Sequence, residues 1–433
     1  MLVGVLLLVV GILGVCDGQE IRSMLNTKSP YPGGAGFRSS KDFDVDCINP
    51  KLIHYNLLAR HGTRFPTTGD LNNFAKLQKK VKDILGQQIQ NPNYNWIKSW
   101  VSPYNPNYQG LLSDVGEWEH YNISKRFLSH FGDFFTSPYT ALSYPIQCTQ
   151  VPRTSRSASS FTFGLWEGKG NIGPSSFEPV AITSESANQD LTLRFFDNCP
   201  LYQSEIASNS SAALDSSLYL KQYSPQILQK VSNVLQLPPF NNLTFSDVSV
   251  MYKICAFEVS SSIYNQFCSL FDHDDLSHFE TSNDLSDYYI KGYGYPINYQ
   301  ISCPLLVDFW TSIQNAIKPG NIEKAKLRFA HAETVLPFAS LLGLFKDDFT
   351  LKWDSPNLSQ RKWRTSIVSP FAANIGVGLY DCSGTYKLQI FHNEIEQPFP
   401  GCGGTYYCPL STVEKLWQNA LQCDFIKLCS TVV

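Results

Sequence analysis

The feature that most constrains this chain is a short apolar run that ends at a basic turn containing glycine. Residues 52–59 are mostly apolar, and Arg60-His61-Gly62 follows them directly. A run of this length with a glycine turn at its end is typical of a buried β-strand. Residues 70–89 then carry apolar side chains at helical spacing. A strand followed by a helix is the building unit of an α/β sheet.

A second unit of this kind lies far downstream. Residues 326–330 predict a strand, and His331-Ala332-Glu333 follows its carboxyl end. Residues 334–345 predict an apolar helix, in which a proline is tolerated only in the first turn. Ligands of open α/β sheets bind beyond the carboxyl ends of the strands. We therefore expect the two turns to share one crevice.

The segment between these units differs in composition. Residues 167–300 are rich in Ser and Asn and show helical patterns at 214–235 and 245–271. We interpret this segment as a mostly helical insertion, a cap over the crevice. The 433 residues are enough for two structural units. The expected division is an α/β domain made of residues 47–166 and 301–433, with residues 167–300 as the cap.

The N-terminus predicts entry into the secretory pathway. Residues 2–13 are almost wholly aliphatic, and small residues follow at 16–18. A run this short at the N-terminus favours a cleaved signal peptide, here residues 1–18, over a membrane span. Residues 19–46 then predict an extended lead-in. No second long apolar segment follows, so we expect a secreted protein without stable membrane insertion, with a lysosome-like destination left open. Four glycosylation sequons agree with this route: Asn122, Asn209, Asn242 and Asn357.

Charge and cysteine content narrow the class further. A formal net charge of −3 argues against a nucleic-acid partner. The chain has 12 cysteines, and loss of Cys16 with a signal peptide leaves an odd number. In an oxidising compartment this predicts several disulfides and one free thiol. Close spacing favours the following pairs: Cys402 with Cys408, Cys423 with Cys429, and Cys255 with Cys268.

The residue types around the first turn suit phosphoryl transfer. This reaction needs a nucleophile, positive charge around the equatorial oxygens and an acid for the leaving group. The imidazole of His61 can serve as nucleophile, and Arg60 and Arg64 flank it with guanidinium groups that match phosphate oxygens. Gly62 lets backbone approach a ligand. The alternative to a phosphoryl-transfer site is an ordinary polar loop.

These residues carry a resemblance to a known family. Arg-His-Gly-x-Arg-x-Pro at residues 60–66 resembles the signature of the histidine acid phosphatases. The segment from His331 to Thr334 is similar to their second signature, in the His-Ala-Glu form of the multiple inositol polyphosphate phosphatases. Residues 153–157 look like the segment that supplies a third phosphate-binding arginine. We assign that role to Arg153, with Arg156 as the alternative.

The resemblance implies a fold, a mechanism and a substrate. The fold would be a three-layer α/β/α domain with a central mixed sheet. His61 would form a covalent phosphohistidine and Glu333 would donate a proton, without a metal or a cofactor. The substrate would be inositol hexakisphosphate and its lower forms. The predicted phosphate-binding residues are Arg60, Arg64, Arg153 and His331.

Other functions and sites remain alternatives. The chain would otherwise be a general acid phosphatase, a bisphosphoglycerate phosphatase or a non-catalytic phosphate-binding secreted protein. The cluster at 272–275 with His278 allows a metal site, but a solvated acidic loop is favoured. Residues 42–45 resemble an aspartyl-phosphatase motif without its strand. Three cations, Arg194, Lys291 and Lys169, either meet outer substrate phosphates or are simply solvated. The oligomeric state is not predicted.

Overall fold

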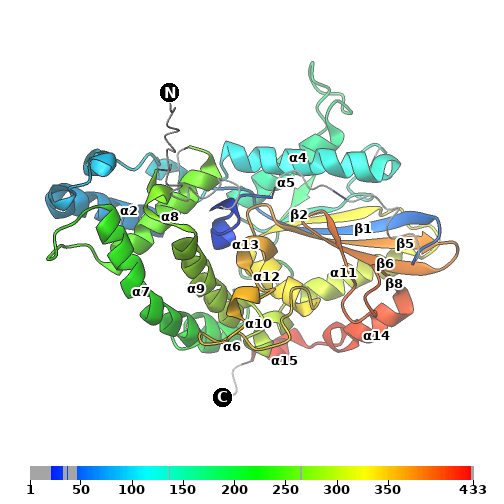
Figure 1. The fold of residues 1–433 in the computed structure, drawn as a ribbon. Helices are drawn as coiled ribbons and strands as arrows, with labels where there is room; N and C mark the ends of the chain where they lie inside the picture. The colour runs from blue at the N-terminus through cyan, green and yellow to red at the C-terminus, as the bar shows by residue number, and fades with distance from the viewer. Residues whose placement is uncertain (1–20, 33–36, 38–45, 136, 264–265, 431–433) are drawn as a thin grey trace, which may run out of the picture.

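The computed structural model describes residues 21–32, 37, 46–135, 137–263 and 266–430 (Figure 1). The predicted signal peptide at 1–18, the motif at 42–45 and much of the lead-in lie outside these ranges. Within them, no helix has both the length and the apolar character that crossing a bilayer requires.

The centre of the molecule is one mixed sheet, in the order β3-β2-β4-β1-β5-β6-β7, with β8 paired to β6. The first four strands of this order pair in parallel, and the pairs from β1 to β5 onward are antiparallel. The strands are β1 Pro50–Arg60, β2 Ile146–Cys148, β3 Ile182–Thr183, β4 Ala325–Ala330, β5 Asn374–Cys382, β6 Tyr386–His392, β7 Ile395–Gln397 and β8 Tyr407–Pro409.

Helices cover both faces of this sheet. Side chains of β1 alternate between two cores, because successive residues of a strand point to opposite faces. Leu57 packs in the core under α4 and α5, whereas Leu58 packs in the core above α11 and α12. The predicted three-layer α/β/α fold is therefore confirmed (Figure 1). The covering helices are α4 Asp114–Phe131, α5 Pro152–Trp166, α11 Cys303–Ala316, α12 Ala332–Leu341 and α14 Leu410–Leu421.

A helical body lies beyond one end of the sheet (Figure 1). Its helices α7 Leu214–Val234, α8 Phe245–Ser261 and α9 His273–Lys291 pack on a core of their own. Helix α2, Thr68–Lys80, contributes Phe74 and Leu77 to that core. The predicted limits of the cap, residues 167–300, stay a prediction, and the helical body also draws on a helix before them.

The remaining elements are short. The helix expected at 70–89 is α2, a π-helical turn and α3 in succession, and the helix expected at 334–345 ends at Leu341. The short elements are η1 Asn26–Lys28, η3 Val81–Leu85, α3 Gly86–Gln88, η4 Pro92–Ser99, η5 Pro106–Tyr108, η6 Gly132–Phe135, α6 Pro200–Tyr202, η7 Gln203–Ala207, η8 Phe267–Leu270, α10 Pro296–Gln300, η9 Leu358–Gln360, α13 Thr365–Val368 and α15 Phe425–Cys429.

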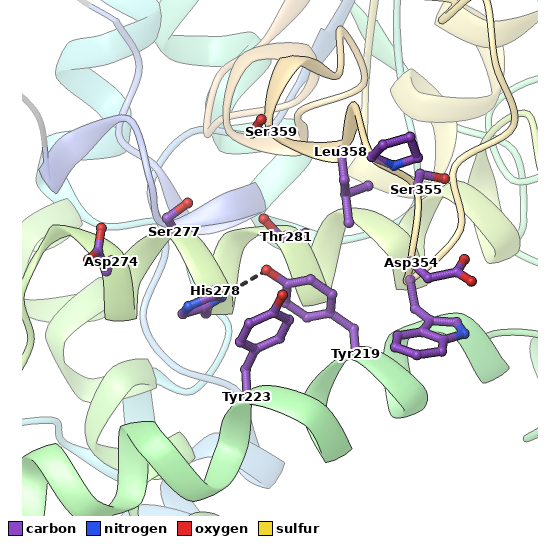
Figure 2. A pocket seen from close by; sticks show the side chains of 12 residues that line it. Tyr219, Tyr223, Asp274, Ser277, His278, Thr281, Asp354, Ser355, Leu358 and Ser359 are labelled. Atoms are coloured by element: carbon purple, nitrogen blue, oxygen red, sulfur yellow. Dashed lines mark hydrogen bonds between the residues drawn. The ribbon is translucent and has the colours of Figure 1, made fainter.

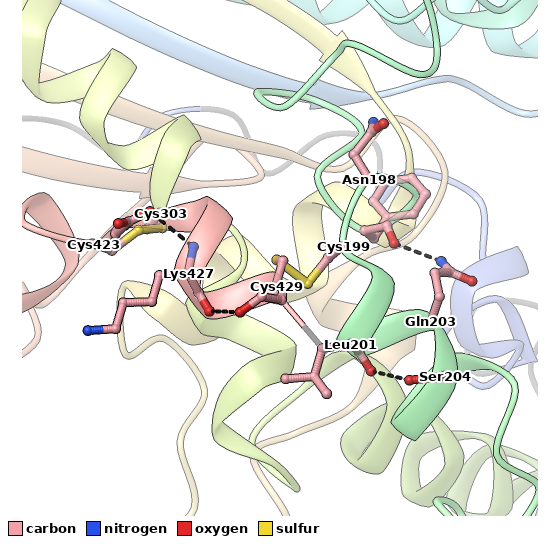
Figure 3. Close-up of a disulfide and its surroundings, with 12 residues drawn as sticks. Asn198, Cys199, Leu201, Gln203, Ser204, Cys303, Cys423, Lys427 and Cys429 are labelled. Carbon is pink, nitrogen blue, oxygen red and sulfur yellow. Dashed lines mark hydrogen bonds between the residues drawn. A yellow bond between two sulfur atoms is a disulfide. The ribbon is translucent and has the colours of Figure 1, made fainter. Parts of the chain in front are cut away.

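Five disulfides join the described cysteines, and two of the three predicted local pairs are confirmed, Cys255–Cys268 and Cys402–Cys408. The predicted pair of Cys423 with Cys429 is wrong. Cys423, two residues after the end of α14, bonds to Cys303 on α11, while Cys429 on α15 bonds to Cys199, just before α6 (Figure 3). The fifth bond joins Cys47 to Cys382, at the outer ends of β1 and β5. The predicted free thiol is Cys148, which is buried.

Candidate active site

Three parallel strands end side by side and deliver the predicted residues to one edge of the sheet. Arg60 is in register with Ala330, and Cys148 is in register with Phe329. The residues that follow these strands therefore emerge together. They are His61 after β1, His331 after β4 and Thr149 after β2.

The ring of His61 is buried and held in one orientation. Its Nδ1 lies 2.9 Å from the carbonyl oxygen of Gly62, so Nδ1 carries the proton and donates it to that oxygen. The Nε2 atom is left with a free lone pair. The backbone N–H of His61 donates to the carbonyl of Ala330 at 2.9 Å. The tautomer with the proton on Nδ1 and a lone pair on Nε2 is the one that a nucleophilic imidazole requires.

The turn that carries His61 rests directly on the start of α4. A Cβ atom added to Gly62 would lie 2.4 Å from the carbonyl oxygen of Gly116, and one added to Gly116 would lie 2.2 Å from that of Thr63. Both positions therefore require glycine because two backbones touch there. Glu119 on the same helix accepts the N–H of Thr63 at 2.7 Å. Helix α4 thus fixes the position of the turn that carries His61.

Among the described residues, no carboxylate forms a salt bridge with any of the three predicted arginines. Arg60 donates from Nη1 to the carbonyls of Thr27 at 2.5 Å and Ser369 at 2.7 Å. Arg64 donates to the carbonyl of Phe65 at 2.9 Å. Across the described ranges, neither of these arginines nor Arg153 forms a salt bridge with an acidic side chain. Their positive charge remains available to an anionic ligand.

His331 is tied to Arg153 on one side and to Thr149 on the other. Nη2 of Arg153 lies 3.3 Å from Nδ1, and Oγ1 of Thr149 lies 2.9 Å from Nε2. Because a guanidinium can only donate, Nδ1 must accept and Nε2 must carry the proton. The His331 and His61 ring centroids are 5.7 Å apart.

Both histidines are held neutral. Burial, followed by the charge of Arg60 and of Arg153, lowers the pKa of His61 well below 6.5. Burial and Arg153 lower the pKa of His331 to about 3. Buried imidazoles beside guanidinium groups lose the protonated form in this way. His61 therefore keeps its lone pair in acid solution.

Glu333 lies in the first turn of α12 and faces a cation from the helical body. Its Oε1 is 3.3 Å from Nζ of Lys291, the last residue of α9. Burial raises the pKa of Glu333, but the charge of Lys291 is the largest of the opposing effects, which together hold the pKa well below its usual range. The start of a helix also favours a carboxylate. The side chain is 44% exposed, which leaves it accessible to a ligand.

The other candidate residues are placed differently. Arg156, the alternative to Arg153, forms a salt bridge with Glu117 and is 51% exposed. Arg194 is paired with Asp197 at 2.6 Å and acts electrostatically on Arg153 and His331, whereas Lys169 donates to the carbonyl of Phe135. The structure thus brings Arg153 into the site, and neither Arg156 nor Lys169.

The acidic cluster in the helical insertion contributes to the N-terminal capping of a helix and to a separate pocket. Asp272 and Asp275 form the reciprocal N-terminal capping box of α9. Figure 2 shows His278 against the ring of Tyr223, with a hydrogen bond of 2.8 Å between its Nδ1 and the hydroxyl of Tyr219. The pocket that they line has a volume of about 330 Å³. In the described part of the chain, no group of three or more His, Cys, Asp or Glu side chains is arranged to hold a metal ion.

Sequence reasoning missed three residues that complete the site. Thr149 fixes the tautomer of His331, and the carbonyls of Thr27 and Ser369 fix the guanidinium of Arg60. Thr27 belongs to η1, in the segment where an extended lead-in was expected. Backbone acceptors leave no trace in side-chain identity, so no sequence signal pointed to them.

Comparison with known proteins identifies the family. The family model described as "Histidine phosphatase superfamily (branch 2)" matches residues 51–393, which include all six predicted site residues. The chain belongs to this superfamily. The predicted family is thereby confirmed, and so is the predicted class of enzyme, a phosphatase of the multiple inositol polyphosphate phosphatase type.

Curated relatives carry matching names. Multiple inositol polyphosphate phosphatase 1 of Dictyostelium discoideum is 33% identical over 86% of this histidine phosphatase and 67% of that protein. The protein of the same name from Homo sapiens is 27% identical over 83% of this chain and 77% of its own length. An acid phosphatase of Schizosaccharomyces pombe is 26% identical over 89% of this chain and 84% of its own.

Solved structures share the fold. The phytase from D. castellii matches with a TM-score of 0.77 and 20% identity, covering 94% of this chain and 87% of that one. The multiple inositol polyphosphate phosphatase of Bifidobacterium longum, in complex with inositol hexasulfate, matches with a TM-score of 0.66 and 19% identity, covering 90% and 96%.

Proposed function

We propose that this histidine phosphatase hydrolyses phosphomonoesters of inositol polyphosphates through a phosphohistidine at His61. The observation that carries the proposal is the free Nε2 of a neutral imidazole beside guanidinium groups that form no salt bridge with any carboxylate of the described residues. A site with these groups, a positively charged hollow around His61, attracts a phosphoryl group and presents a nucleophile to it in the same place.

In the first step, Nε2 of His61 attacks phosphorus in line with the ester oxygen. The N–P bond forms as the P–O bond breaks, and the carboxyl group of Glu333 gives its proton to the departing alkoxide. Arg60, Arg64 and Arg153 bind the three oxygens of the transferring group, where negative charge is concentrated. His331 acts on the same group through Arg153, whose guanidinium it orients; direct contact of His331 with phosphate stays a prediction.

In the second step, water attacks the phosphohistidine. Glu333, now a carboxylate, accepts a proton from this water, and the electron pair of the N–P bond returns to Nε2. Inorganic phosphate leaves and the proton is back on Glu333, so the cycle closes. Because arginine side chains provide the positive charge, we propose no metal or cofactor.

The relatives named as inositol polyphosphate phosphatases support the substrate. Further cations near the site also favour a ligand with several phosphates. The charges of Arg64 and Lys253 both act on Lys28 and lower its pKa, after burial as the main cause, to about 8. Arg194 and Lys291 lie on the other side, near Arg153 and Glu333.

Trapping the intermediate tests the nucleophile. Rapid-quench reaction with a radioactive phosphate ester should label the wild-type protein with an adduct that is stable in base and labile in acid. His61→Ala should show no label. Equal labelling of both proteins would contradict the assignment of His61.

Comparing substrates tests the specificity. We expect a higher kcat/KM for inositol hexakisphosphate than for bisphosphoglycerate or for a small monoester. Equal values would favour a general acid phosphatase, which the relative from Schizosaccharomyces pombe keeps in consideration.

We also propose that the protein is secreted. Five disulfides among the described cysteines support an oxidising compartment. Detection of the glycosylated protein in the medium of expressing cells, and its absence from the cytosol, is the measurement that checks this.

A further inference from the structure

Lys291 stands between two carboxylates that come from different parts of the fold. Its Nζ lies 3.0 Å from Oδ1 of Asp287, one turn earlier on α9, and 3.3 Å from Oε1 of Glu333 on α12. The lysine side chain is 20% exposed and that of Asp287 is 15% exposed. One ammonium group of the helical body thus contacts the proton donor of the proposed reaction.

The backbone that carries this lysine is fixed, whereas its ammonium can move. The hydroxyl of Tyr202 donates to the carbonyl of Ile290 at 3.0 Å, and a Cβ atom at Gly292 would lie 2.5 Å from the ring of Trp363. The end of α9 is therefore anchored on both sides of Lys291. The four-carbon stem of a lysine still has free rotation, and the contact with Glu333 is the longer of its two.

This contact sets a chemical problem. A proton donor must be protonated when substrate is bound, yet Lys291 stabilises the carboxylate form of Glu333. The second step needs that same carboxylate as a base. The charged or titratable groups that interact with the pair are Asp287, Tyr202, His331, Arg60, Arg64 and Arg153. Arg194 and Asp197 act on members of this set, on Arg153 and His331 and on Tyr202 respectively.

We propose that Lys291 is a positioning residue that keeps Glu333 ionised until a second phosphate group of the substrate draws the ammonium away. This inference rests on the proposed function. A neighbouring phosphate on an inositol ring competes with Glu333 for the ammonium of Lys291, while Asp287 keeps its own contact with that ammonium. Glu333 then takes up the proton that it gives to the leaving alkoxide. Once the product leaves, Lys291 returns and stabilises the carboxylate that activates water.

The test compares the high-pH limb of kcat for two substrates, because kcat reports groups of the enzyme–substrate complex. Glycerol 2-phosphate has an alkoxide leaving group and no second phosphate, whereas inositol hexakisphosphate has five more. In the wild type, the limb should lie at higher pH with inositol hexakisphosphate. In Lys291→Met, the limb with glycerol 2-phosphate should move up by about one pH unit, and the limb with inositol hexakisphosphate should move less.

Two further variants sharpen the test. Asp287→Asn leaves the ammonium wholly to Glu333, so the limb with glycerol 2-phosphate should move to lower pH. Lys230→Met removes a cation that pairs with Asp272 at the opposite end of α9, and its limbs should match those of the wild type.

The possible results separate the two proposals. Limbs that stay in place in both Lys291→Met and Asp287→Asn, or that move equally for both substrates, overturn the role of Lys291. A loss of kcat without a shift in the limb also overturns it, because a merely structural lysine would give that result. If the wild type releases no phosphate from either ester, the proposed function itself fails.

Discussion

Two groups of arginines, each with one buried and one half-buried member, differ in what lies opposite their charge. At the carboxyl edge of the sheet, Arg60 faces backbone carbonyls and Arg153 faces a neutral imidazole. Between α9 and α13, Arg361 is 2.6 Å from Asp284 and Arg364 is 2.8 Å from Glu280. Carbonyls and neutral imidazoles orient a guanidinium without cancelling its charge, whereas carboxylates cancel it.

The difference separates recognition from structure. The first group holds its arginines in place and leaves a net positive hollow. The second joins the helical body to the sheet domain, since Asp284 on α9 also accepts the N–H and the hydroxyl of Thr365 on α13, both at 2.7 Å. Burial is similar in the two groups, so the partners decide the role. Four predictions test this comparison.

The largest effect is expected when the structural group is broken. Arg361→Met leaves the carboxylate of Asp284 buried without its cation, which should cost about 3–5 kcal/mol of unfolding free energy. Urea unfolding at pH 9, where Asp284 is largely ionised in the wild type, measures this cost, with Arg156→Met as a surface control.

The same variant has a defined pH dependence. Burial already raises the pKa of Asp284 to about 7, against the charge of Arg361. Without that charge the pKa of Asp284 in the native state rises further above its unfolded value, so the variant takes up the proton at a higher pH than the wild type does. The destabilisation should therefore be largest at pH 9 and shrink as the pH falls from 9 to 7. A destabilisation that grows as the pH falls would contradict the assignment of Asp284 as the carboxylate left unpaired in this variant.

The second effect concerns the recognition group. Arg153→Ala should lower kcat/KM by about 10²- to 10³-fold, as expected for a positioned donor, with little change in thermal stability. Arg156→Ala, one turn along the same helix, should retain activity because its partner Glu117 is at the surface. If Arg153→Ala lost stability instead of activity, the two groups of arginines would not differ in the way described.

A smaller effect is expected from the partner of His331. Thr149→Val removes the acceptor for the Nε2 proton and should lower kcat/KM by up to about tenfold, the worth of one hydrogen bond. Ser155→Ala is the control, because its hydroxyl only contacts the carbonyl of Pro152 on an exposed turn. No change in Thr149→Val would show that the ring is oriented by Arg153 alone.

The smallest expected effect is a near-absence of change. Because the pKa of His61 lies well below 6.5, its lone pair should persist as the pH falls from 6.5 to 5. With 4-nitrophenyl phosphate, and after division by the substrate's own ionisation, kcat/KM should fall by less than about twofold. A tenfold loss per pH unit from 6.5 downward would mean that His61 titrates normally and that the hollow is not cationic.

The sequence was sufficient for the parts of the site that are local. Residues 52–66 identified the strand, its turn and two arginines, because the chemistry there is carried by side chains in one short segment. The second turn, with His331 and Glu333, was equally readable, and parallel-sheet geometry correctly placed the two turns together.

Contacts between distant segments were not predictable in the same way. Close spacing suggested that Cys423 bonds to Cys429, but their true partners lie 120 and 230 residues away. Likewise, the acceptors for Arg60 are backbone atoms, 33 and 309 residues from it. Pairings of this kind are set by the packing of helices on the sheet, which a linear pattern does not encode.

The bare contact between Gly62 and Gly116 makes α4 a mechanical reference for the nucleophile. With no side chain between the two backbones, a tilt of the helix passes undamped into the turn. A misplacement of a catalytic group by about 1 Å can cost about a hundredfold in rate. Substitutions on the outer face of α4, where Trp118 is 60% exposed, therefore offer a means of tuning catalysis from the surface. They do so without touching any group that binds phosphate.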